Sequence, residues 1–150
     1  MYSRILVATD GSELAGKGVA AGLALAKALQ AQVVLVTASE PWQDVYPGDP
    51  NGMALSSELR DGYRKAKRAD CKRILDEART QATAAGVDVV DAVYVADRMP
   101  ADAILETAEA QGADLVVMAS HGRSGLRKLL LGSQTQAVLS HGTLPVLVVR

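Results

Sequence analysis

Residues 115–122 read Leu-Val-Val-Met-Ala-Ser-His-Gly, an apolar run that ends in small and polar residues. Similar runs of branched aliphatic residues occupy positions 5–8, 33–36 and 146–149. Continuous rather than alternating runs are typical of strands covered on both faces, as in a parallel sheet between helices, although short buried helices share the pattern. A fifth segment, residues 87–95, alternates more and is expected nearer a sheet edge.

Helical patterns separate these runs. From Glu13 to Leu29 small and apolar residues recur three and four positions apart, and Gly18 and Gly22 on the same stripe allow close approach to the sheet. The other helices are expected from about Ser57 to Ala85, from Pro100 to near Gly112, and from Ser133 onward. The second of them carries a stripe formed by Leu59, Tyr63, Ala66, Ile74, Ala78 and Ala82. Cys71 at its edge is interpreted as a small buried side chain, with a redox role as the alternative.

The regular alternation of strand and helix predicts an α/β fold, a three-layer sandwich with a parallel sheet and right-handed crossovers. The chain has 150 residues and a formal net charge of −1, and we expect one domain over residues 1–150. One connection is long: residues 40–56 contain three prolines and two glycines, and form either a lid or an insertion without a role.

Composition excludes several classes of protein. With no Phe, one Trp and nearly balanced acidic and basic residues, the chain lacks the basic field and stacking aromatics of a nucleic-acid-binding protein. The longest uncharged stretch, residues 129–149, is interrupted by Gly, His and Pro, so no membrane partner is expected. The first residues enter a strand directly, and a single cysteine cannot form an internal disulfide, so we expect a cytoplasmic protein. No G-x4-G-K-(S/T) segment is present, which excludes a P-loop ATPase.

Ligands of such sheets bind beyond the carboxyl ends of the strands, where residues 8–13 and 118–125 form small, polar, glycine-bearing loops. The second loop leads to a helix start at Ser133, where Gln136 completes a capping-box pattern. Backbone N–H groups at that helix end favour an anion, and Arg123, Arg127 and Lys128 add positive charge. Glycines at positions 122, 125 and 132 permit close approach or positive φ, and the Ser133 and Thr135 hydroxyls can donate. Phosphate is the ligand group that this pattern favours, although a capped helix start and solvated basic residues are also common without a ligand.

In these loops the sequence resembles the universal stress protein family, whose ATP-binding members carry G-x2-G-x9-G-(S/T). Here Ala119, Gly122 and Gly132-Ser133 reproduce that spacing, with alanine in place of the first glycine. The likeness extends over the whole chain, including the segments 5–12, 112–118 and 144–149. It implies five parallel strands in the order 3-2-1-4-5 and a site for ATP, AMP or ADP, with or without Mg²⁺. It also implies a homodimer paired through the last strand, Pro145 to Val149.

The resemblance also assigns roles to single residues, grouped by the part of the nucleotide that each is expected to contact. The adenosine is expected beside Ala8, Asp10 and Ala38, the ribose beside Met118, Ala119 and Gly122, and the phosphates beside Arg123, Gly132, Ser133, Gln134 and Thr135. Asp10 has an alternative role as a helix-start residue that accepts a backbone N–H. His121 has no acidic or nucleophilic partner at a recognisable spacing and is expected to be a structural or hydrogen-bonding loop residue.

Three functions remain open at this point. The first is an adenine-nucleotide-binding sensor or regulator in stress adaptation, with no catalytic residue and no resident metal. The second is a slow ATP hydrolase, for which Asp10 is the evident nearby carboxylate. The third is a nucleotide-free dimeric interaction module, suggested by Ala119 in the place of glycine.

Overall fold

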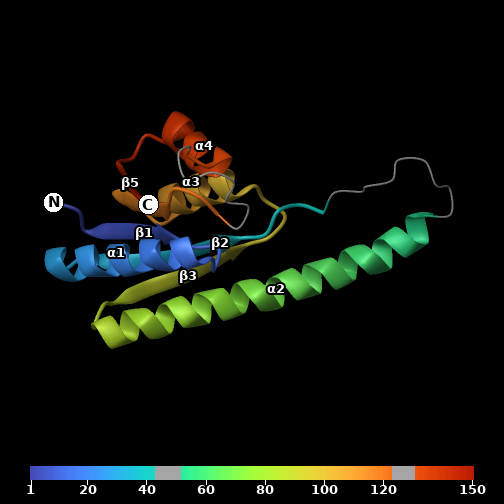
Figure 1. Ribbon diagram of the computed structural model, residues 1–150, viewed down its shortest axis with the longest axis horizontal. Helices are drawn as coiled ribbons and strands as arrows, with labels where there is room; N and C mark the ends of the chain where they lie inside the picture. The colour runs from blue at the N-terminus through green and yellow to red at the C-terminus, as the bar shows by residue number, and fades with distance from the viewer. Residues whose placement is uncertain (43–51, 123–130) are drawn as a thin grey trace.

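The computed structural model describes residues 1–42, 52–122 and 131–150, and of residues 52–56 the backbone alone. Strands and helices alternate along the described chain (Figure 1), as β1 (Arg4–Ala8), α1 (Glu13–Leu29), β2 (Gln32–Ala38), α2 (Gly52–Ala85), β3 (Val89–Val95), α3 (Pro100–Ala110), β4 (Leu115–Ala119), α4 (Ser133–His141) and β5 (Val146–Val149). The expected elements are all present. The one clear difference is that α2 begins at Gly52 rather than near Ser57, so the predicted long connection is shorter. Residues 43–51 lie outside the described chain, and the lid remains a prediction.

The five strands form one parallel sheet in the order β3-β2-β1-β4-β5, as expected. Val7 at the centre of β1 lies between Leu35 of β2 and Val117 of β4. The strand order reverses at β1, because the chain proceeds to β2 on one side and returns later as β4 on the other. The loops after β1 and β4 therefore start side by side and diverge, which is where sheets of this kind bind ligands.

Two apolar cores cover the two faces of the sheet. Alternate residues of the strands pack against α1 and α2 on one face, among them Val7, Leu35 and Val117. The intervening residues pack against α3 and α4 on the other face, where Figure 1 shows these two helices. The inner strands are buried on both sides, which explains why their sequences are continuously apolar.

Helix α1 lies close against the sheet because two glycines face it. A Cβ on Gly18 would lie 3.4 Å from the backbone N of Ala119, and a Cβ on Gly22 only 2.7 Å from Val7 Cγ2. Ser12 caps the helix, with its Oγ accepting the Ala15 N–H at 3.1 Å. This close packing brings the start of α1 beside the ends of β1 and β4.

Helix α2 extends beyond the sheet, and its N-terminal half projects past the body of the protein (Figure 1). Leu59 is accordingly 60% exposed, and Ala66 is also exposed, so the predicted apolar stripe does not begin there. Half-buried residues on α2 begin with Arg60 and Tyr63, and fully buried ones begin with Cys71 on the face that packs on β2 and β3. Cys71 is buried, as predicted.

Candidate functional site

A cavity of about 360 Å³ opens at the carboxyl ends of the strands. Its volume lies in the range of small-molecule sites. Ten of the eleven predicted site residues line it: Ala8, Asp10, Ala38, Met118, Ala119, Gly122, Gly132, Ser133, Gln134 and Thr135. The eleventh, Arg123, lies outside the described residues, as do Gly125, Arg127 and Lys128. The geometry brings the residues together, and their role in binding stays a prediction.

The loop after β1 is held by its own side chains. Gly11 has a φ of 76°, and its N–H donates to Thr9 Oγ1 at 3.2 Å. Asp10 Oδ1 accepts the Ser12 N–H at 2.9 Å, which is the helix-start contact that the alternative interpretation of Asp10 predicted. This contact fixes the carboxylate at the cavity wall and uses one of its oxygens.

The loops after β1 and β4 meet at Asp10 and Gly122. A Cβ on Gly122 would lie 2.7 Å from Asp10 Oδ2, so a larger residue there would displace the carboxylate. A Cβ on Gly132 would lie 3.1 Å from the Ser120 carbonyl oxygen. At both positions glycine provides space, and neither has a positive φ. Close approach is therefore the reason for glycine at these two motif positions.

The start of α4 differs from the predicted capping box. Gly132, not Ser133, is the N-cap, and its carbonyl accepts the Gln136 N–H at 2.9 Å. The Gln136 side chain donates instead to the Leu131 carbonyl at 3.1 Å. Gly132 takes the capping position because its N–H donates to Ser120 O at 2.8 Å, a tertiary contact that local spacing does not encode. As a result the N–H groups of Ser133, Gln134 and Thr135 occupy the first three helical positions, which have no acceptor within a helix.

Two of the side chains expected to hold phosphate have structural partners. Thr135 is buried, and its hydroxyl donates to the carbonyl oxygens of Ala119 and Ser120 at 3.1 and 3.2 Å. Gln134 Oε1 accepts the Ala101 N–H at 2.9 Å and so caps α3, whose own N-cap Met99 supplies no side-chain hydrogen bond. The Thr135 hydroxyl and the Gln134 amide oxygen are therefore engaged within the protein, whereas Ser133 is exposed.

The residues between β4 and Gly122 also have defined contacts. Ala119 is the last residue of β4, pairs with Val149, and has no positive φ, so alanine fits the backbone there without strain. His121 Nδ1 lies 2.9 Å from Ser120 Oγ, in agreement with a hydrogen-bonding loop residue. His121 Nε2 is buried and has no hydrogen-bond partner among the described residues.

Sequence reasoning missed the wall of the cavity that α2 provides. Tyr63, Lys67, Asp70, Cys71 and Ile74 line the cavity from that side. Their spacing of three and four residues marks one helix face, and extending the predicted stripe through its polar members would have found them. What the sequence does not indicate is that this face meets the end of β2.

The Tyr63 hydroxyl joins that wall to β2. It donates to the Glu40 carbonyl at 3.3 Å, and its ring contacts Trp42 with centroids 5.1 Å apart. Partial burial, and then the charges of Glu40 and Asp97, raise the pKa of this hydroxyl above its ordinary value, so it stays a donor at neutral pH. The Lys67 ammonium lies 5.5 Å from the centre of the same ring.

Charge on the described lining is mixed. Asp10, Glu40 and Asp70 contribute carboxylates and Lys67 an ammonium. The described residues hold no group of three or more His, Cys, Asp or Glu side chains that could bind a metal ion by themselves. A Mg²⁺ ion carried by a polyphosphate needs only one or two protein carboxylates, and Asp10 fits that requirement. No helix within the described residues is long and apolar enough to span a membrane.

Comparison with known proteins agrees with this fold. The sequence profile described as the Universal stress protein family matches residues 1–150. The chain belongs to the universal stress protein family. A universal stress protein of Thermus aquaticus is 38% identical, and universal stress protein YxiE of Bacillus subtilis is 33% identical, each over the full length of both chains.

Solved structures of the family superpose on this universal stress protein. The structure of MJ0577 has a TM-score of 0.79 at 27% identity and covers 99% of this chain and 96% of its own. A universal stress protein solved in complex with cAMP has a TM-score of 0.72 at 31% identity, with 99% and 97% covered. The motif spacing, the strand order and the relatives therefore agree on the family.

Proposed function

We propose that the protein binds an adenine nucleotide, ATP in the first instance and AMP or ADP as alternatives, and acts as a cytoplasmic sensor or regulator in stress adaptation. The observation that carries the proposal is the opening of α4 into the cavity. Three successive N–H groups, those of Ser133, Gln134 and Thr135, stand at the positive end of the helix dipole beside the cavity. A phosphate group would accept these hydrogen bonds.

The rest of the nucleotide would lie along the strand ends. Ala8, Asp10 and Ala38, which line the cavity, would border the adenosine, and Met118, Ala119 and Gly122 would border the ribose. The gaps left by Gly122 and Gly132 let the backbone approach the ligand. The solved relative that holds cAMP supports an adenine nucleotide, because it shares 31% of the sequence over nearly the whole chain.

The alternative of a nucleotide-free module depended on Ala119. The backbone of Ala119 needs no glycine, which favours binding over that alternative. Hydrolysis would need a positioned water molecule, and Asp10, with one oxygen holding Ser12 N–H, would have to act through Oδ2 or a bound Mg²⁺. Nucleotide binding without turnover is therefore our first proposal.

A homodimer paired through β5 is the second part of the proposal. Among the described residues β5 pairs with β4 alone, and Leu147 of β5 is 39% exposed, so one side of an apolar strand is open to a partner. A second copy would continue the sheet and cover this side chain.

The substitution Ser133→Asp tests the phosphate site. A carboxylate at the first position of α4 stabilises the helix by roughly 0.3–1 kcal/mol, but it competes with phosphate for the same N–H groups. We expect ATP affinity, measured by isothermal titration calorimetry, to fall at least tenfold while the melting temperature stays the same or rises.

Two controls accompany this variant. Ser133→Ala removes only the exposed hydroxyl and should change affinity a few-fold at most. Ser140→Asp adds the same charge near the other end of α4 and should leave affinity unchanged. If Ser133→Asp binds ATP as tightly as the wild-type protein, the start of α4 is not part of the binding site. If the unmodified protein binds none of ATP, AMP and cAMP, the proposal is refuted.

A further inference from the structure

The cavity has two ends of different chemistry. One end is the start of α4, which is hydrogen-bonded to the end of β4 through Gly132 and Ser120. The other end is α2, which packs on β2 and β3. Strand β1 lies between β4 and β2, so the two ends are about 10 Å apart, or two strand spacings. If the phosphates lie at α4, as proposed above, the base lies at α2, and the inference that follows rests on that proposal.

The α2 end presents carboxylates. Asp70 lines the cavity from α2 and Glu40 lines it from the end of β2. A carboxylate only accepts hydrogen bonds and offers about four acceptor positions, so contacts already made to it leave room for a donor from the ligand. Lys67, one turn before Asp70 on the same wall, is the only donor among the charged residues of the described lining.

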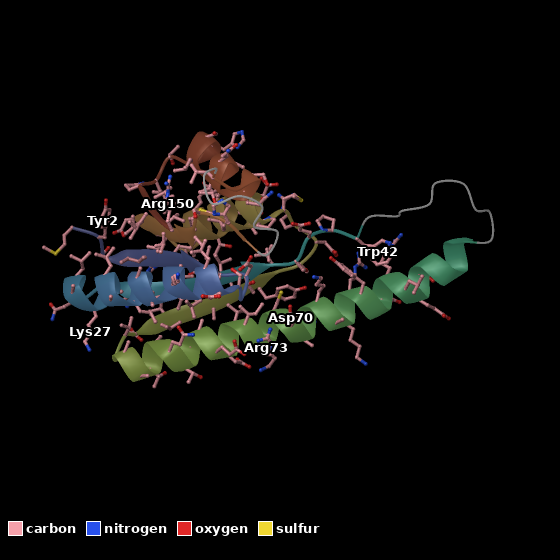
Figure 2. All side chains as sticks on the ribbon, in the orientation of Figure 1. Tyr2, Lys27, Trp42, Asp70, Arg73 and Arg150 are labelled. Atoms are coloured by element: carbon pink, nitrogen blue, oxygen red, sulfur yellow. The ribbon has the colours of Figure 1, made fainter. Side chains whose placement is uncertain are left out.

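Asp70 is held in place from outside the cavity. Its Oδ1 accepts a hydrogen bond from Arg73 Nη2 at 2.7 Å, and Arg73 Nη1 donates to Glu77 at 2.7 Å. The Asp70 side chain is 32% exposed, less than either of those partners. Figure 2 shows Asp70 and Arg73 in the middle of α2, where the helix passes the strand ends. A carboxylate positioned in this way can contribute to specificity, because it loses little freedom on binding.

The substituent at position 6 of a purine determines whether the base can donate a hydrogen bond to a carboxylate at that position. Adenine carries an amino group there, which donates, whereas hypoxanthine and guanine carry an oxo group, which only accepts. An oxo group that faces a carboxylate cannot form a hydrogen bond with it and adds repulsion, and the N–H that 6-oxopurines carry at the neighbouring position 1 could reach the carboxylate only if the base shifted. We propose that Asp70 accepts a hydrogen bond from the 6-amino group of the base and gives the cavity its preference for adenine over 6-oxopurine nucleotides.

Comparing ATP with ITP tests this assignment, because the two differ only in the base, where ITP has an oxo group at position 6 and an N–H at position 1. Titration calorimetry on the full chain should give an affinity for ATP at least roughly tenfold higher than for ITP. In Asp70→Asn the amide can donate as well as accept, so the ratio should fall to about threefold or less. Asp76→Asn is the matched control, because Asp76 lies on the same helix, pairs with Lys72 and is absent from the cavity lining. It should keep the wild-type ratio.

Several outcomes would overturn the inference. Equal affinity of the wild-type protein for ATP and ITP does so without any variant. An unchanged ratio in Asp70→Asn, folded by circular dichroism, does so as well. Should that variant not fold, the triphosphate of purine riboside, which has hydrogen at position 6, provides the test. Its affinity should lie between those of ATP and ITP. Tighter binding of ITP than of this triphosphate would assign position 6 to Lys67. Nucleotide binding without base preference removes this inference alone, whereas no nucleotide binding removes the proposed function too.

Discussion

Gly16 and Gly22 lie six residues apart on α1 and have different reasons to be glycine. No atom outside its local chain neighbourhood lies within 4 Å of a Cβ placed on Gly16. A Cβ on Gly22 would lie 2.7 Å from Val7 Cγ2 and 3.5 Å from Val117 Cγ1. Valine is stiff at χ1 and both valines are fully buried, so they cannot easily move aside.

Alanine at these two positions should therefore have opposite effects on stability. Gly16→Ala gains helix propensity and should raise the free energy of unfolding by about 0.5–1 kcal/mol. Gly22→Ala gains the same propensity but overpacks the core, and should lower it by about 1–2 kcal/mol net. Urea denaturation followed by circular dichroism measures both, and destabilisation by Gly16→Ala would contradict the open surroundings described for that position.

At the scale of elements, one carboxylate joins the starts of two neighbouring strands. Asp114, just before β4, accepts hydrogen bonds from Ser3 N–H at 2.8 Å, Ser3 Oγ at 2.7 Å and Arg4 N–H at 3.0 Å. Burial acts to raise the pKa of Asp114, but the hydrogen bonds from Ser3 and Arg4 outweigh it and lower the pKa below its ordinary value. These contacts fix the register of β1 against β4, and with it the level at which their loops meet.

The stability that Asp114 provides should depend on pH. Because the pKa is lower in the folded state, its contribution is complete above the unfolded value of about 4 and is lost as the pH falls through the folded value. Asp114→Asn should cost about 1–2 kcal/mol at pH 7, allowing for solvent screening, and the difference from wild type should shrink below pH 4. Urea denaturation at pH 7, 4.5 and 3 measures it, with Asp61→Asn on the exposed face of α2 as control. A difference that does not vary with pH would show that the charge of Asp114 is not involved.

The elements also show how far the sequence could predict the structure. Apolar periodicity located every strand and the bounds of α1, because those residues face the core directly. The start of α2 was missed because the helix projects beyond the sheet there, and the first of its side chains that the structure describes, residues 57–59, are exposed. The N-cap of α4 and the cavity wall that α2 provides were missed for another reason, because each depends on a contact between residues distant in sequence. The N-cap depends on the contact of Gly132 with Ser120, and the wall on the contact of α2 with the end of β2. Eleven residues were predicted to share a site, and the ten of them that the structure describes line one cavity.

At the scale of the whole molecule, the two edge strands differ. On β3, Asp91 Oδ1 accepts the N–H of the next residue, Ala92, at 2.8 Å, and Gln111 holds the other Asp91 oxygen at 2.9 Å. A backbone donor midway along β3 is thereby occupied, which blunts that edge. Val90 on β3 and Leu147 on β5 are similarly exposed, at 41% and 39%. Exposure alone does not distinguish the edges, and the Asp91 contacts do.

The proposed dimer predicts different effects for matched charges on these edges. Leu147→Lys should shift the protein from dimer to monomer, because it would place two ammonium groups, one from each copy, at the interface between the paired β5 strands, where like charges repel. Val90→Lys should leave the dimer intact. Sedimentation velocity at micromolar concentration distinguishes the two, and a wild-type monomer, or dissociation by Val90→Lys instead, would rule out pairing through β5.

The Asp91 contact on β3 also bears on how large an assembly can grow. Two copies joined at β5 would present β3 at both outer margins of the shared sheet, and there the Ala92 N–H is already taken. Neither margin offers an uninterrupted template, so strand-by-strand polymerisation has no point of propagation. In such a dimer, the hydrogen bond between Asp91 Oδ1 and the Ala92 N–H would therefore protect the outer margins of the shared sheet against fibre formation.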